Sequence, residues 1–102
     1  MALPYTPKNW QLSSYTNNTW TDFVSEAGIV QTLSISNPTG TPIDVEIRRE
    51  DASSGLAVIL PATTIDTNQS YVLEKVINIT GTQAIQIKCD LAGIEFDANG
   101  VV

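Results

Sequence analysis

The stretch that decides the fold runs from Ile29 to Ile47 and reads Ile29-Val-Gln-Thr-Leu-Ser-Ile-Ser-Asn-Pro-Thr-Gly-Thr-Pro-Ile-Asp-Val-Glu-Ile47. Residues 29–36 and 43–48 both alternate with a period of two, and in the second segment apolar residues alternate with charged ones. This period is that of a β-strand with one buried face. Residues 37–42 between them carry one asparagine, two prolines and a glycine, which are typical turn residues. The stretch therefore predicts an antiparallel β-hairpin with an apolar and a polar face.

Further short strands are expected on both sides of this hairpin, and no segment has the period of a helix. Residues 20–25 predict a first strand with mixed faces. After the hairpin, a charged loop precedes the longest apolar run, which predicts a buried strand closed by a proline. The segments concerned are Leu56–Leu60 before Pro61, then Tyr71–Ile79, Ala84–Cys89, and a last strand from Ile94 interrupted at Asn99-Gly100. Six to eight short strands predict an all-β fold: a single antiparallel β-sandwich or jelly-roll-like domain.

Four of the seven aromatic residues lie in the first twenty positions, five residues apart: Tyr5, Trp10, Tyr15 and Trp20. A spacing of five matches neither a helix face nor a strand face, so these rings cannot form one stripe on a regular element. Prolines and polar residues between them favour an extended conformation. We therefore expect an extended N-terminal arm over residues 1–19 and a β-sandwich domain over residues 20–102.

The four arm rings are candidates for a subunit interface, because Tyr and Trp bury a large area with few rotatable bonds. The alternative is that they fold back on their own sandwich, and Trp20 is the ring expected in the domain core. Arg48 and Arg49, followed by two acids, are further interface candidates; the alternative for them is a solvated loop.

Composition excludes several classes of function. The chain has 102 residues and a net charge of −6, which is the size of one domain with an acidic surface. A nucleic-acid partner would need a basic stripe, and the same argument disfavours anionic membranes. The apolar runs are too short for a membrane span. No secretory signal is visible at the N-terminus, so synthesis in a cytoplasm is expected.

No constellation of residues points to catalysis, and we expect neither enzymatic activity nor a cofactor. The absence of histidine removes the commonest general base and metal ligand. Cys89 lies on the apolar face of its strand, which predicts a buried thiol. Two carboxylate pairs, Asp44 with Glu46 and Glu95 with Asp97, are expected on polar faces as solubilising charges, although paired carboxylates could in principle cleave glycosides.

Metal binding has one possible location, near Asp97. Asp90, Glu95, Asp97 and Asn99 offer oxygen atoms, and Asp97-Ala98-Asn99-Gly100 matches part of a calcium-binding loop. Position 101 is valine and no glutamate follows at the required distance. An ordinary turn is therefore expected, with no metal site.

From residue 28 to the C-terminus the sequence resembles a group of small virion proteins from tailed bacteriophages. The resemblance is one of pattern: the hairpin from Ile29 to Ile47, then Ser70-Tyr71-Val72-Leu73, then Gly81 to Ile87, and a short Gly100-Val101 end. It implies a structural, non-enzymatic component of the virion, assembled in the cytoplasm of a bacterial host. No functional residues carry over.

The resemblance implies a capsid cement or decoration protein that forms a homo-oligomer, expected as a trimer, on a capsid or tail scaffold. Its partners would be copies of itself and another virion protein, such as the major capsid protein. A neck, tail or fibre-attachment protein is the alternative within this class. An alternative of another class is a carbohydrate- or cell-surface-binding module in which Trp10, Tyr15 and Trp20 stack on sugars.

Overall fold

The computed structural model describes residues 6–13, 18–51 and 55–102, and these residues form nine β-strands. The strands are β1 (Pro7–Leu12), β2 (Thr21–Val24), β3 (Gly28–Asn37), β4 (Ile43–Asp51), β5 (Gly55–Ile65), β6 (Gln69–Leu73), β7 (Ile77–Ile79), β8 (Gln83–Cys89) and β9 (Glu95–Val101).

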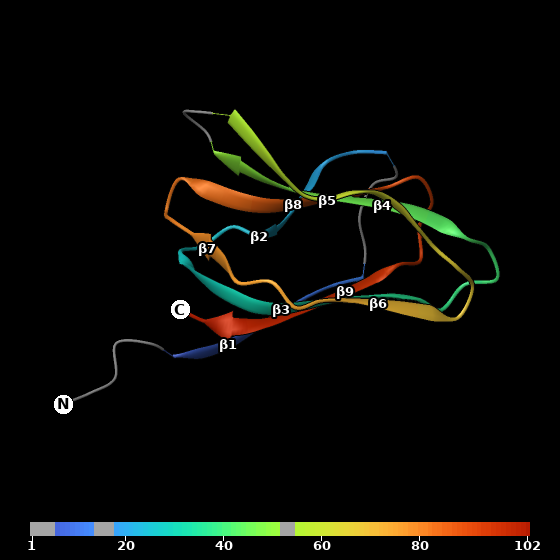
Figure 1. Ribbon diagram of the computed structural model, residues 1–102, viewed down its shortest axis with the longest axis horizontal. Coiled ribbons are helices and arrows are strands. Elements are labelled where there is room, and N and C mark those ends of the chain that lie inside the picture. Colours follow the sequence, from blue (N-terminus) through green and yellow to red (C-terminus); the bar gives the residue numbers. More distant parts are fainter. Residues whose placement is uncertain (1–5, 14–17, 52–54) are drawn as a thin grey trace.

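The strands form two antiparallel sheets that face each other (Figure 1). One sheet has the order β1-β9-β3-β6, with β7 also paired to β3, and the other has the order β2-β8-β4-β5. Their inner faces enclose the core, where the rings of Phe23 and Phe96 lie 5.8 Å apart across the sandwich. The expected all-β sandwich is confirmed.

The connectivity of the two sheets is that of a jelly roll. The strands β6 and β7 pair with successive parts of β3 and together occupy one strand position. Counted in this way, eight strands alternate between the sheets along the chain, except that β4 and β5 are neighbours in the same sheet. This arrangement is the double-sheet form in which two Greek keys are wrapped together.

The hairpin expected from Ile29 to Ile47 is wrong, because β3 and β4 belong to different sheets. The turn between them is a corner of the sandwich that the buried side chain of Asn37 stabilises. Its amide nitrogen donates to the carbonyl oxygens of Thr41 (2.9 Å) and Ile65 (2.8 Å). Its oxygen accepts from the backbone N–H and the hydroxyl of Thr39. The alternating pattern was correct for each strand but did not specify which strand lies beside it.

Most of the core consists of residues that the alternation placed on apolar faces, but it also contains Trp10 from the expected arm and Val30, which the irregular register of β3 turns inward. The inward side chains of β4, β8, β3 and β9 are almost fully buried, as is the thiol of Cys89, as expected. Burying a side chain of this size stabilises the fold by about 1.5–3 kcal/mol.

The apolar run from Leu56 to Leu60 is not a buried strand closed by Pro61. It is part of β5, the edge strand of its sheet, which continues to Ile65. The register shifts on both sides of Ile47, and Pro61 occupies one of the irregular positions, where a proline is tolerated. Because an edge strand has one neighbour and an open outer face, Leu56 and Val58 are 62% and 69% exposed.

Two other expected boundaries are also wrong. The segment from Tyr71 to Ile79 is divided between β6 and β7, and β9 continues through Asn99-Gly100. At this position β3 has one extra residue between Val30 and Thr32 and comes very close to β9. A β-carbon on residue 100 would collide with the carbonyl group of Ile29, so only glycine allows the strand to continue.

The expected extended arm needs a correction over residues 7–12. These residues form β1, which pairs with β9 along its whole length at the edge of the five-stranded sheet. Trp10 is 7% exposed and packs in the core of its own chain, so it is not available as an intermolecular anchor. The pairing of β1 with β9 supplies backbone hydrogen bonds and places Trp10 in the core between the sheets. The spacing of the aromatic residues did not predict this pairing. Tyr5 and Tyr15 lie outside the described residues.

Candidate interaction surface

The outer face of the four-stranded sheet carries the remaining aromatic candidate, Trp20. This residue directly precedes β2, and its half-buried ring lies outside the core cluster, contrary to expectation. Asn18 has a left-handed backbone (φ 56°), and its N–H donates to the carbonyl oxygen of Cys89 at 2.7 Å. Asparagine adopts this conformation more readily than most residues. The bond attaches the segment to β8 and so positions the ring over the sheet.

Two cations lie against the ring of Trp20. The guanidinium carbon of Arg48 on β4 is 4.0 Å from the ring centroid, and Nζ of Lys88 on β8 is 5.1 Å away. Attraction between a cation and an indole ring at an exposed site contributes about 0.5–1 kcal/mol. The stack therefore holds Trp20 and Arg48 in place rather than leaving two freely rotating side chains.

A row of hydrogen bonds across three strands fixes the same arginine from the other side. Nε of Arg48 donates to Oε1 of Gln86 at 2.8 Å, and Nε2 of Gln86 donates to Oδ1 of Asp22 at 2.9 Å. These residues are direct register partners, so the row follows the strand pairing. Nζ of Lys88 lies 3.8 Å from Oε1 of Glu46. We call Trp20, Asp22, Arg48, Gln86 and Lys88 the stacked patch.

Trp and Arg are, together with Tyr, the residue types most enriched at energetic hot spots of protein interfaces. Here they are preorganised on an outward sheet face, so little side-chain freedom is lost when a partner binds. Val58, the exposed register partner of Arg48 on β5, extends this face with an apolar side chain. The arrangement is suited to binding a protein surface.

Arg49 does not belong to the stacked patch. Although adjacent in sequence to Arg48, it lies on the other face of β4, and its Nη1 is 3.5 Å from the carbonyl oxygen of Asn78. Four of the residues proposed for an interface are described by the structure, and of these it brings together Trp20 and Arg48 but not Trp10 or Arg49. The sequence analysis missed Asp22, Gln86 and Lys88, whose outward alternation was visible but whose nearness to Trp20 depends on strand order.

The carboxylate pairs have local partners on polar faces. Oδ1 of Asp44 accepts from the hydroxyl of Thr64 at 2.6 Å. The side-chain amide of Asn9 on β1 donates to Oδ1 of Asp97 (2.8 Å) and to Oδ1 of Asn99 (2.9 Å). Two of the four residues considered for calcium, Asp97 and Asn99, thus accept hydrogen bonds from an amide. Within the described residues, no three Asp, Glu, Cys or His side chains are grouped as metal ligands would be.

One carboxyl group has a perturbed pKa. Nε1 of Trp10 donates to Oε1 of Glu26 at 2.9 Å, and Nζ of Lys8 lies 3.3 Å from the same oxygen. The hydrogen bond from Trp10, followed by the one from Lys8, lowers the pKa of Glu26 below 4.5. This group anchors β1 to the segment between β2 and β3, so it is part of the structural framework.

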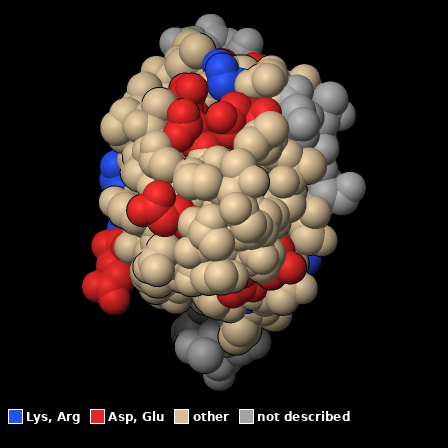
Figure 2. Space-filling view, turned by 90° about the vertical axis from the view of Figure 1, so that its right-hand side faces the viewer, with Lys and Arg blue, Asp and Glu red and all other residues tan. Residues whose placement is uncertain are grey.

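The remaining surface is acidic and shallow. The end of the sandwich shown in Figure 2 carries several groups of acidic side chains, as the net charge of −6 leads one to expect. A hollow of about 350 Å³ lies between β1 and β9 and is lined by Gln11, Leu12, Ser13, Glu95, Phe96 and Asp97. None of the described residues belongs to a helix that could cross a membrane.

A scan of the sequence against models of protein families finds no match, and a search among curated proteins finds no similar sequence. The stacked patch and the fold are therefore the features of the molecule that bear on its function.

Proposed function

We propose that this chain is a structural virion protein of a tailed bacteriophage, without enzymatic activity, that attaches to another virion protein through the stacked patch. The observation that carries the proposal is the preorganised pair of Trp20 and Arg48 on an outward sheet face. The jelly-roll topology supports it, because viral capsid domains commonly have this fold. Fold alone does not imply function, so the surface residues carry the argument.

Within the virion, capsid decoration is the role we favour over a neck, tail or fibre-attachment role. A decoration protein needs a flat face that binds many equivalent sites, and multiple copies then hold through multivalency even when each contact is weak. The acidic surface is suited to a partner with basic residues around the docking site. A homo-oligomer, expected as a trimer when assembled on the capsid scaffold, remains part of this proposal.

Two measurements on particles test the role. Mass spectrometry of purified virions should find the chain in a fixed ratio to the major capsid protein. Particles assembled without the chain should release their DNA at a lower temperature and should regain stability when the purified protein is added back. A chain that is missing from purified virions would refute the proposal.

The docking face is tested by adding variants to particles that lack the chain. Trp20→Ala and Arg48→Ala should each weaken binding about 10- to 100-fold, because hot-spot truncations cost about 1.4–2.8 kcal/mol. The matched controls are Tyr71→Ala, an exposed aromatic on the other sheet, and Lys75→Ala, an exposed base far from the patch. Equal loss in controls and test variants would show that another surface binds.

Carbohydrate binding is the competing function, because lectins also have jelly-roll domains. The position of Arg48 disfavours it, since the guanidinium already occupies a face of Trp20 on which a sugar would stack. Titration of the purified chain with glycans should leave its tryptophan fluorescence unchanged. Saturable quenching that disappears in Trp20→Ala would establish the carbohydrate function instead.

A further inference from the structure

The outer edge of β5 differs from every other sheet edge among the described residues. Edge strands present unpaired backbone groups, and proteins usually protect them with charges, prolines, bulges or short length. The edge strand β1 has Pro7 and Lys8, and β2 has four residues with an irregular register. The third edge is divided into β6 and β7 by a link that contains Glu74 and Lys75.

By contrast, β5 has eleven residues without a single charge. Its irregular positions and its proline lie from Ile59 onward, whereas Gly55 to Val58 pair regularly with β4. These four residues form the free edge of the sheet, in the part of the β4–β5 hairpin that extends away from the opposite sheet (Figure 1). Leu56 and Val58 are the exposed side chains there. The segment is a regular, uncharged and accessible pairing edge.

We propose that two copies of this chain associate through antiparallel pairing of β5 with β5, which joins the two four-stranded sheets into one continuous sheet of eight strands. The inference goes beyond the proposed function and does not depend on it. An antiparallel pair related by a twofold axis buries the same segment of both copies, so the segment must be compatible with itself. A strand without charges meets this condition, because no like charges face each other.

The charges on the neighbouring strand select the register. On the outer face Val58 is opposite Arg48, and Leu56 is opposite Glu50. In the dimer a row of neighbouring side chains would cross four strands, from β4 and β5 of one copy to β5 and β4 of the other. A twofold axis at Val58 would place Arg48 at both ends of one such row. An axis at Leu56 would place Glu50 at both ends. An axis at Ala57 brings Val58 beside Leu56 of the second copy, so each row has Arg48 at one end and Glu50 at the other.

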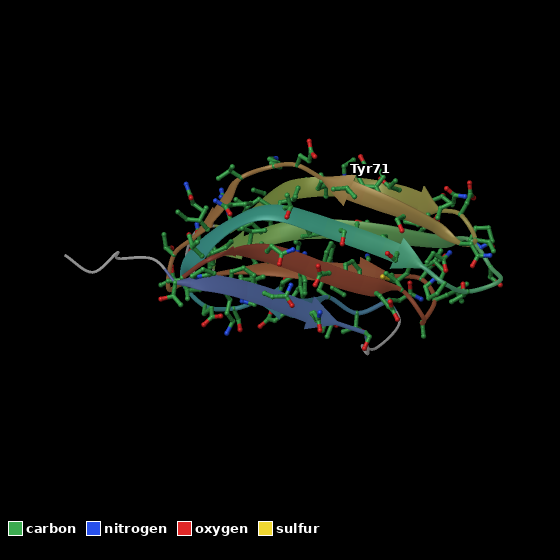
Figure 3. The ribbon with its side chains drawn as sticks, turned by 90° about the horizontal axis from the view of Figure 1, so that it is seen from below. Tyr71 is labelled. Atoms are coloured by element: carbon green, nitrogen blue, oxygen red, sulfur yellow. The ribbon has the colours of Figure 1, made fainter. Side chains whose placement is uncertain are left out.

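The ends of such a row are three strand spacings apart, or about 14 Å. At this distance salt screens the charges strongly, so they choose the register while apolar contact and backbone hydrogen bonds supply the affinity. Ala57 on the axis is small enough for the two strands to approach. The other exposed apolar side chains on this side of the sandwich, such as Tyr71 on β6 (Figure 3), belong to the opposite sheet and do not enter the joint.

Sedimentation velocity over a concentration series tests the association. The purified chain should pass reversibly from 11.0 kDa to twice that mass. Val58→Lys should weaken dimerisation about tenfold or more, because it puts two ammonium groups into the joint. The matched control is Val76→Lys, which makes the same change at a position of nearly equal exposure, 66% against 69%. Circular dichroism should be unchanged in both variants.

A cross-link tests the register separately and does not rely on the lysine variant. Under mild oxidation Ala57→Cys should give a disulfide-linked dimer, whereas Val76→Cys should associate without becoming cross-linked. The native Cys89 is buried and does not compete. The inference is overturned if the chain stays monomeric up to about 1 mM, the weak end of specific association. Equal weakening by the two lysines, or equal cross-linking of the two cysteine variants, would overturn it as well.

Discussion

Asn37 shows how a single polar residue directs the chain from one sheet to the other. It is the one buried polar residue of the described core, and its amide donates to the carbonyl oxygens of Thr41, in the turn before β4, and of Ile65, at the end of β5. A buried polar group of this kind is favourable only when its hydrogen bonds are complete. The residue therefore stabilises the corner and disfavours the simple hairpin that the local sequence suggests.

Replacing this residue should be costly. We expect Asn37→Ala to lower the free energy of unfolding by about 2–4 kcal/mol, because the buried carbonyl group of Ile65 and the part-buried carbonyl group of Thr41 lose their donor. Urea denaturation measures the change. The matched control, Asn78→Ala at an exposed position of β7, should cost less than about 0.5 kcal/mol. Similar losses in the two variants would mean that the corner does not depend on the amide.

Glu26 gives the fold a defined dependence on pH. Its pKa in the folded chain is lowered below 4.5 by the hydrogen bond from Trp10 and by Lys8. The unfolded chain therefore binds a proton at a higher pH than the folded chain, so the stabilisation is complete above about pH 4.5 and disappears as the pH falls through the folded value.

Glu26→Gln should accordingly be less stable than the natural chain at pH 7, and the difference should shrink as the pH falls from about 5 to 3. Urea midpoints over a pH series measure it. Glu74→Gln, a change at an exposed link, is the control and should show no such convergence. A constant difference at all pH values would show that the carboxylate charge is not involved.

At the scale of elements, β1 is the strand whose role changed most between sequence and structure. Its pairing with β9 covers an edge that would otherwise be open, and Trp10 covers the core beneath it. Trp10 and Trp20 belong to the same series of aromatic residues in the sequence, but they have different structural roles. The first stabilises the fold, and the second belongs to the surface.

This difference is measurable. Trp10→Ala should lower the free energy of unfolding by about 3–5 kcal/mol, as truncating a buried aromatic does. Trp20→Ala should cost about 1 kcal/mol, because it removes mainly an exposed cation–π stack. Denaturation curves of the two variants, each the control for the other, make the comparison. Equal costs would contradict the separate roles assigned to the two rings.

For the molecule as a whole, most contacts between residues join segments that are distant in sequence. The first strand pairs with the last, and the two halves of the core come together only when both sheets exist. Such a topology folds slowly, because chain entropy is lost before contacts compensate for it. A chain of this size with one core is expected to unfold in a single transition.

We therefore expect refolding with a time constant of milliseconds to seconds. Tryptophan fluorescence, which reports on Trp10 and Trp20, and far-ultraviolet circular dichroism should give coincident denaturation curves. Fluorescence of Trp20→Ala isolates the signal of Trp10 and serves as the control. Separate transitions would mean that β1 detaches before the rest of the sandwich unfolds.

The sequence alone determined the class of structure and most of the core. Period-two alternation identifies which side chains face inward, as at Val45, Ile47 and Cys89, because a strand places successive residues on opposite faces whatever its neighbours are. The sequence also offered Trp20 and Arg48 as interface candidates, although it placed the ring of Trp20 in the core, where the structure does not have it. Only the tertiary structure decided that β3 and β4 lie in different sheets, that Trp10 is internal and that Leu56 is exposed. Alternation specifies faces but not partners, since pairing depends on the free energy of the whole arrangement of strands.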